Sequence, residues 1–156
     1  KMAMQYLRGV CQRNELAEGG YDLCGHHLVL DEVDIPLCAI ACETDHIAPW
    51  KDSYRGVQKM GSADKTFIMT QSGHIAGIVN PPSKGKYGHY TNDDLTQNHE
   101  SWLEGAAFHE GSWWPRWEKW LGKRSGKQVE ARIPGADNRE ILCDAPGTYV
   151  VVKARG

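Results

Sequence analysis

Two short apolar runs lie in the middle of the chain, and each ends in a polar loop. Residues 37–42 form a continuous apolar run that leads into residues 43–45, and residues 66–69 form a second run that leads into residues 71–74. Continuous apolar runs of this length are typical of strands buried on both faces of a parallel sheet. We therefore expect two neighbouring buried strands here.

A helical pattern separates the two predicted strands. Trp50, Tyr54 and Val57 recur at i, i+4 and i+7 and form one apolar face, while Pro49 opens the helix and Gly61 ends it. The order strand, helix, strand is that of a β-α-β unit, whose crossover is right-handed by default. The pattern thus predicts an α/β fold.

The flanking regions are predicted more coarsely. Loose helical periodicity covers residues 4–16, and a hairpin or an extended crossing segment is expected over residues 21–34. Residues 83–94 are polar and rich in Gly and Tyr, which predicts a long loop. Tryptophans near helical spacing predict a helix over residues 113–122, and the apolar residues 149–152 predict a short edge strand.

Composition excludes several classes of function. The 156 residues suggest at most one domain, and 40% hydrophobic residues suffice for a core. The net charge of −2 and the pI near 6.4 give no support for a nucleic-acid partner, which normally requires a basic surface. No apolar stretch is long enough to span a bilayer, and residues 1–10 do not have the pattern of a signal peptide.

Cysteine usage indicates a reduced, intracellular protein. The count is odd, the spacing is irregular and no CxxC pair is present, so we expect no zinc site built on thiolates. The one histidine pair, His26 and His27, lacks placed carboxylates, so we expect no metal and assign the pair to a surface segment. The cysteines are Cys11, Cys24, Cys38, Cys42 and Cys143.

Two residues at the predicted strand ends could carry chemistry. Asp45 follows the first strand and His74 the second, and ligands of α/β sheets bind outside the carboxyl ends of the strands. A carboxylate that reaches a histidine can fix its tautomer and stabilise its protonated form. The order acid before histidine also fits the α/β-hydrolase arrangement. On spacing alone, Asp45 could instead be a turn or helix-cap residue, and His74 a polar loop residue.

The residue order around these two positions resembles that of class I polyhydroxyalkanoate synthases. The segment around Asp45 resembles the acid loop of that family, and Gly-His-Ile-Ala-Gly with the following Asn-Pro-Pro resembles the histidine loop more closely. The similarity runs from about Leu16 to the C-terminus. The similar segments are residues 43–50, 72–82, 86–88, 90–92, 111–115 and 144–150.

The resemblance implies an α/β-hydrolase fold, with a mostly parallel sheet and flanking helices. This chain would be its C-terminal part, incomplete without the N-terminal portion. Residues 1–34 would be the end of a cap- or lid-like segment and a crossing hairpin, and residues 35–156 the C-terminal part of the catalytic core.

The resemblance also implies an activity and its setting. Synthases of this kind are acyltransferases that polymerise 3-hydroxyacyl-CoA into polyester through a cysteine thioester and release CoA. Class I members use short-chain substrates such as 3-hydroxybutyryl-CoA and form homodimers. The implied location is the cytoplasm, at the granule surface of the growing polyester. No cofactor is implied, because the substrate itself carries the CoA.

The same resemblance assigns roles within a Cys-His-Asp triad. By position, Asp45 is the acid, and His74 is the base that deprotonates first the thiol and later the attacking 3-hydroxyl group. His46 matches a histidine that commonly follows the acid, and its accessory role stays open. Residues beyond the base that could shape the substrate pocket are Ile75, Asn80, Tyr87, Tyr90 and Asn92.

The nucleophile of such a triad is missing from this chain. No cysteine lies in a G-x-C-x-G elbow, and no G-x-S-x-G is present, so we expect the cysteines to be structural. We therefore expect the chain alone to be inactive, and stable only with an N-terminal portion. The alternatives are a hydrolase of the same fold, such as an esterase or depolymerase, and a non-catalytic remnant that binds a synthase or a granule.

A tryptophan cluster and a basic cluster near the C-terminal helix can each be interpreted in two ways. The tryptophans could line an apolar path for substrate or polymer, but packing of the helix on the sheet is favoured. The basic residues could contact the phosphates of CoA, but a solvated helix face is favoured. The clusters consist of Trp113, Trp114, Trp117 and Trp120, and of Lys119, Lys123, Arg124 and Lys127.

Overall fold

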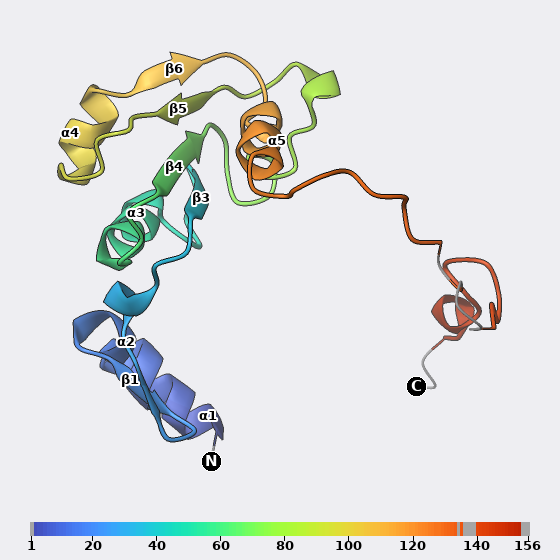
Figure 1. Ribbon diagram of the computed structural model, residues 1–156, viewed down its shortest axis with the longest axis horizontal. Helices are drawn as coiled ribbons and strands as arrows, with labels where there is room; N and C mark the ends of the chain where they lie inside the picture. The colour runs from blue at the N-terminus through green and yellow to red at the C-terminus, as the bar shows by residue number, and fades with distance from the viewer. Residues whose placement is uncertain (1, 134, 136–139, 154–156) are drawn as a thin grey trace. The chain divides into compact units, whose positions relative to one another are not determined.

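The computed structural model describes residues 2–133, 135 and 140–153 (Figure 1). They fall into two compact units, Lys1–Arg124 and Ser125–Gly156. The first unit contains a two-stranded hairpin, a four-stranded sheet and several helices, so the predicted combination of strands and helices is confirmed.

The N-terminal segment is helical and then forms a hairpin. Helical turns cover most of the region where helical periodicity predicts them, although the middle stretch is a π-helix, and the predicted hairpin follows. Many apolar side chains of this segment, such as those of Met2 and Leu7, are exposed. The elements are α1 (Met2–Gln5), the π-helix Tyr6–Gln12, α2 (Glu15–Glu18), β1 (Tyr21–Leu23), β2 (His26–Leu28) and the 3-10 helix Leu30–Glu32.

A β-α-β unit forms the centre of the first unit, as the sequence predicts. Strand β3 (Leu37–Cys42) pairs parallel with β4 (Lys65–Thr70), and α3 (Trp50–Lys59) connects them. The register places Cys42 opposite Thr70, the last residue of one strand opposite the last residue of the other. The loops that follow the two strands therefore start at the same level of the sheet.

The remaining strands differ from the prediction. β5 (His89–Thr91) pairs antiparallel with β4, and β6 (Ala107–His109) pairs antiparallel with β5, in the order β3-β4-β5-β6 (Figure 1). The expectation of a mostly parallel sheet is therefore wrong for the described part of the chain. The loop predicted over residues 83–94 is also wrong where β5 lies. Three residues carry too little periodicity to predict a strand, and β5 gains its conformation from two neighbouring strands.

One face of the sheet carries an aromatic core. Phe67 and Met69 of β4 pack there with residues of α3 and of α4 (His99–Glu104), including the fully buried Trp102. The sequence pattern did not predict α4. Asn98 caps this helix, because its side chain accepts the Ser101 N–H at 2.9 Å. The buried core residues are Ala41, Trp50, Tyr54, Val57, Phe67, Met69 and Trp102.

Helix α5 (Trp114–Gly122) lies over the opposite face of β4. Ile68 alternates along the strand with the core residues Phe67 and Met69 and is itself fully buried. A cleft of about 370 Å³ is lined by Thr66 and Ile68 of β4 and by residues of α5 such as Arg116. The helix predicted over residues 113–122 is thus confirmed, and it covers the face that α3 and α4 leave open.

Within the tryptophan cluster and the basic cluster, the residues differ in exposure and in contacts. Trp113 is buried, with 8% of its surface exposed, whereas Trp114 and Trp117 are exposed at the surface of α5. Arg124 forms an ion pair with Asp64 and lies over the ring of Trp120, with its guanidinium carbon 4.2 Å from the ring centre. Contacts within the protein therefore involve Trp113, Trp120 and Arg124, while Lys119, Lys123 and Lys127 are exposed.

The C-terminal unit contains a short helical turn where an edge strand is predicted. Residues Tyr149–Val151 form a 3-10 helix, closed by a hydrogen bond from the Val152 N–H to the Tyr149 carbonyl at 3.0 Å. The predicted strand is therefore wrong. Valine-rich runs favour strands only where a neighbouring strand accepts their backbone bonds, and no such partner occurs in the described residues of this unit.

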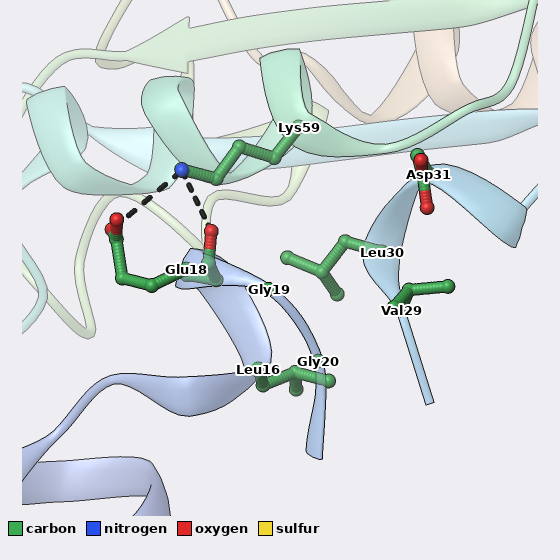
Figure 2. Close-up of a pocket in the computed structure, with 9 residues that line it drawn as sticks. Leu16, Glu18, Gly19, Gly20, Val29, Leu30, Asp31 and Lys59 are labelled. Atoms are coloured by element: carbon green, nitrogen blue, oxygen red, sulfur yellow. Dashed lines mark hydrogen bonds and ion pairs between the residues drawn. The ribbon is translucent and has the colours of Figure 1, made fainter. Parts of the chain in front are cut away.

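The N-terminal segment is attached at the C-terminal end of α3. The Lys59 ammonium donates to the carbonyl of Ala17 at 2.7 Å and lies 3.7 Å from the Glu18 carboxylate (Figure 2). The cavity beside these contacts has a volume of about 320 Å³ and is also lined by apolar residues, among them Leu16 and Leu30. Because the crossover helix runs back along the sheet, this cavity lies away from the loops that follow β3 and β4. The domain boundary predicted near residue 34 stays a prediction.

Gly61 provides a test of this attachment. A Cβ atom at Gly61 would lie 1.7 Å from the carbonyl oxygen of Asp31, whereas a Cβ at Gly56 in α3 would meet nothing within 4 Å. We expect Gly61→Ala to destabilise a full-length protein that contains this segment by about 1–3 kcal/mol through overpacking. Gly56→Ala should instead stabilise it by up to about 1 kcal/mol through helix propensity. Equal melting temperatures for the two variants would contradict the close contact.

Candidate functional site

Asp45 lies in the loop directly after β3 and is held by the backbone of that loop. Its Oδ1 accepts the N–H of Ile47 at 2.8 Å and the N–H of Ala48 at 2.9 Å, so the aspartate shapes the turn that leads into α3. The loop is tied to the next strand, because the Glu43 N–H donates to the Thr70 carbonyl at 2.8 Å. Oδ1 thus stabilises the turn, and Oδ2 is available for a different contact.

That other oxygen contacts His74, which lies in the loop after β4. The distance from Nδ1 of His74 to Oδ2 of Asp45 is 2.8 Å. The carboxylate side chain is only 6% exposed, whereas the imidazole is 47% exposed. The pair therefore has a buried acid and an imidazole that remains accessible.

The pKa of the Asp45 carboxyl group is lowered to about 2. The bond from the Ala48 N–H is the largest cause, burial opposes it, and the bonds from His74 and from the Ile47 N–H add to the lowering. The group is therefore ionised at neutral pH and can only accept hydrogen bonds. In a neutral His74, the proton must then be on Nδ1, which leaves the lone pair on Nε2 to accept a proton from another group.

The backbone of the histidine loop, residues 71–80, is tightly constrained. Ser72 has a φ of 76°, a left-handed conformation that is costly for a residue other than glycine, and its carbonyl accepts the Thr44 N–H at 3.1 Å. The Gly77 N–H donates to the Gly73 carbonyl at 2.9 Å, which closes a turn around His74. These contacts fix the imidazole relative to the acid loop.

The other predicted site residues do not join this pair. His46 and Ile75 are exposed, the latter at 72%, and the structure records no contact of their side chains with the pair in the described residues. Asn80 is fully buried and donates to the Tyr87 carbonyl at 3.0 Å, so it supports the loop. Tyr90 packs against the core, with its ring centre 5.0 Å from that of a phenylalanine on β6. Their contact with a substrate stays a prediction.

Two tryptophans contact the histidine loop in a way that the sequence did not predict. The indole N–H groups of Trp113 and Trp114 donate to carbonyl oxygens of this loop. Both residues belong to the Gly-Ser-Trp-Trp-Pro segment, residues 111–115, which resembles the synthase family, but their spacing along the chain gave no signal of this contact.

The two cysteines of β3, Cys38 and Cys42, lack the environment of an activated nucleophile. Burial raises the pKa of the Cys42 thiol, and the charge of Asp45 adds to the rise. Burial also raises the pKa of Cys38. Both thiols are therefore held in the protonated form, which is the poorer nucleophile. The other cysteines, Cys11, Cys24 and Cys143, are free and exposed.

The described part of the chain offers neither a metal cluster nor a membrane-spanning helix. Within residues 2–133, 135 and 140–153, no group of three or more His, Cys, Asp or Glu side chains could hold a metal ion. No helix in this part of the chain is long and apolar enough to cross a membrane.

The fold and the site together define an α/β protein with a carboxylate–imidazole pair at the ends of two parallel strands. Comparison of the sequence with known proteins places it in a family. It is 42% identical over 146 residues to the poly(3-hydroxyalkanoate) polymerase subunit PhaC of Rhizobium etli. These residues cover 94% of this chain and 23% of that protein. It is 42% identical over 150 residues to the poly(3-hydroxyalkanoate) polymerase of Methylorubrum extorquens, covering 96% of this chain and 25% of that protein.

A third relative agrees with these two. The subunit PhaC of Cupriavidus necator is 38% identical over 151 residues, which cover 96% of this chain and 26% of that protein. The chain belongs to the poly(3-hydroxyalkanoate) polymerase family and matches a C-terminal portion of it, as the motifs predicted. It spans about a quarter of the length of these relatives. No protein-family model matches the chain.

The lowered pKa of Asp45 leads to a test by titration. Its value of about 2 lies below the ordinary 3.8, so the ionised carboxylate stabilises the fold above pH 3.8, and this stabilisation is lost as the pH falls toward 2. We expect the carboxyl carbon of Asp45, followed by NMR in a full-length polymerase that contains this segment, to titrate near pH 2. Its signal is assigned by its absence in Asp45→Asn. A midpoint at 3.8 or above would contradict the hydrogen bonding described here.

Proposed function

We propose that this chain is part of the catalytic core of an acyltransferase that polymerises 3-hydroxyacyl-CoA into polyhydroxyalkanoate. Asp45 would be its triad acid and His74 its triad base. The observation that carries the proposal is the 2.8 Å contact between Nδ1 of His74 and the Asp45 carboxylate, in a chain that belongs to the polymerase family. The relatives are poly(3-hydroxyalkanoate) polymerases by name, which supports a substrate of the 3-hydroxyacyl class.

In the first half of the reaction, His74 acts as a general base and then as a general acid. Nε2 accepts the proton of a cysteine thiol supplied by another part of the polymerase, and the ionised Asp45 stabilises the resulting imidazolium. The thiolate attacks the thioester carbonyl, the bond from that carbonyl carbon to the sulfur of CoA breaks, and the CoA thiolate takes the proton from His74. The products are an acyl-cysteine and free CoA.

In the second half, His74 acts as a base toward an alcohol. Nε2 accepts the proton of a 3-hydroxyl group, whose oxygen attacks the acyl-cysteine carbonyl. The new ester bond lengthens the polymer, and the cysteine leaves as a thiolate that recovers the proton from His74. The half-exposed imidazole is compatible with this use, because its outer nitrogen has to reach a group outside this chain.

We further propose that the rest of the polymerase extends the sheet beyond β3. In the described sheet β3 is an edge strand, and four of its six residues, from Leu37 to Ile40, are only partly buried. The unpaired backbone N–H and C=O groups of such an edge strand can form hydrogen bonds with a further strand. This arrangement would complete an α/β-hydrolase fold and bring the nucleophile to the exposed side of His74. A homodimer in the cytoplasm at the surface of the polyester granule, with no further cofactor, belongs to the same proposal.

The base role of His74 is tested by substitution in a full-length polymerase that contains this segment. With 3-hydroxybutyryl-CoA as substrate, we expect His74→Ala to lower the rate of CoA release by about 10³-fold or more. His26→Ala is the matched control, because His26 is an exposed histidine of the hairpin, and its rate should equal that of the unmodified enzyme. A His74→Ala rate within a few-fold of the control would contradict the proposal.

The product of the same assay separates the synthase from its alternatives. Release of CoA together with a polyester of high mass supports the acyltransferase. Release of CoA with free 3-hydroxybutyrate as the product would indicate a hydrolase of the same fold. Absence of CoA release together with retained binding to granules would favour a non-catalytic binding role.

A further inference from the structure

Two indole groups outside the acid–histidine pair are hydrogen-bonded to the histidine loop. Nε1 of Trp113 donates to the Gly77 carbonyl at 3.0 Å, and Nε1 of Trp114 donates to the Ile78 carbonyl at 2.9 Å. The accepting residues lie three and four positions after His74. Two consecutive side chains at the start of α5 thus hold two consecutive peptide groups of the loop that carries the imidazole.

Gly77 connects the tryptophan hydrogen bonds to the turn that contains His74. A Cβ atom there would lie 2.7 Å from Sγ of Cys42 and 2.9 Å from the Gln71 carbonyl oxygen, so the loop packs directly on the strand ends. Its N–H donates to the Gly73 carbonyl and closes the turn that contains His74. A shift of Gly77 would therefore be transmitted through one turn of backbone to the imidazole.

The tryptophans are themselves anchored to the sheet. On the next turn of α5, Arg116 donates to Nε2 of His89 at 3.3 Å and contacts Nε2 of His109 at 3.1 Å. The two imidazoles stack with their ring centres 5.1 Å apart. His89 faces Thr70, the last residue of β4, in the register of the sheet. The start of α5 is thus fixed to β5 and β6, next to the point where the histidine loop begins.

We propose that Trp113 and Trp114 are positioning residues for His74, whose indole N–H groups set the distance between the imidazole and Asp45. This inference rests on the proposed role of His74 as a base. A displacement of a catalytic group by about 1 Å can lower a rate by about 100-fold. The two tryptophans therefore act on the chemical step and leave binding of the acyl-CoA largely unchanged.

Phenylalanine substitutions test this role in a full-length polymerase that contains the segment. Trp113→Phe and Trp114→Phe keep an aromatic ring and remove the N–H donor. Trp117→Phe is the matched control, because Trp117 lies on the same helix and donates no hydrogen bond to the loop in the described structure. We expect kcat for CoA release to fall about 10-fold or more in each of the first two variants, and about 100-fold in the double variant, with KM within about 2-fold. Trp117→Phe should retain the rate of the unmodified enzyme.

A spectroscopic readout separates this inference from the proposed function. In protein labelled with ¹⁵N-histidine, the Nδ1–H signal of His74 is assigned by its loss in His74→Ala. We expect that signal to shift or broaden in Trp113→Phe and Trp114→Phe and to stay unchanged in Trp117→Phe. If His74→Ala retains activity, the proposed function fails, yet the Nδ1–H signal still reports whether the tryptophans position the imidazole.

Three outcomes would overturn the positioning role. One is an unchanged Nδ1–H signal in both Trp113→Phe and Trp114→Phe. Another is a loss of kcat in Trp117→Phe as large as in those two variants, which would indicate general loosening of α5. The third is a rise in KM with kcat unchanged, which would place the tryptophans in substrate binding. Because Trp113 is buried and its variant could fold poorly, the partly exposed Trp114 provides the decisive variant in that case.

Discussion

Parallel pairing of β3 with β4, in a register that ends both strands together, is the constraint on which the candidate site depends. Cys42 lies opposite Thr70, and the chain leaves both strands at the same edge of the sheet. Asp45 and His74 then need only three and four residues of loop to meet. A shift of this register would separate the loops by about 3.3 Å per residue, more than a hydrogen bond can bridge.

The two faces of the sheet hold this edge in different ways. On one face, α3 and α4 pack an aromatic core around Phe67 and Trp102, which fixes the strands. On the other face, α5 is bonded to the sheet through Arg116 and to the histidine loop through Trp113 and its neighbour. The acid is fixed from its own loop, where two backbone N–H groups hold one oxygen and lower its pKa. Backbone bonds thus place the carboxylate, while side chains from a distant helix support the loop of its partner.

These contacts define a carboxylate–imidazole pair at one edge of the sheet. The pair consists of an ionised acid and a half-exposed imidazole, and the pKa values of the β3 thiols, Cys38 and Cys42, are raised by burial. The chain belongs to the polymerase family and spans about a quarter of the length of its relatives. In the described sheet β3 is an edge strand, and its first four residues are only partly buried.

The sequence by itself determined the central β-α-β unit and the identity of the candidate pair. Apolar runs specified β3 and β4, the spacing of Trp50 and Tyr54 specified α3, and the loop motifs pointed to Asp45 and His74. Only the tertiary structure decided the antiparallel strands β5 and β6, the turn at residues 149–151 and the bonds from the tryptophans to the histidine loop. The physical reason is the distance along the sequence over which each interaction acts. Periodicity and motifs reflect interactions between residues that are close in sequence. Three-residue strands and indole donors gain their hydrogen-bond partners only when distant segments pack together.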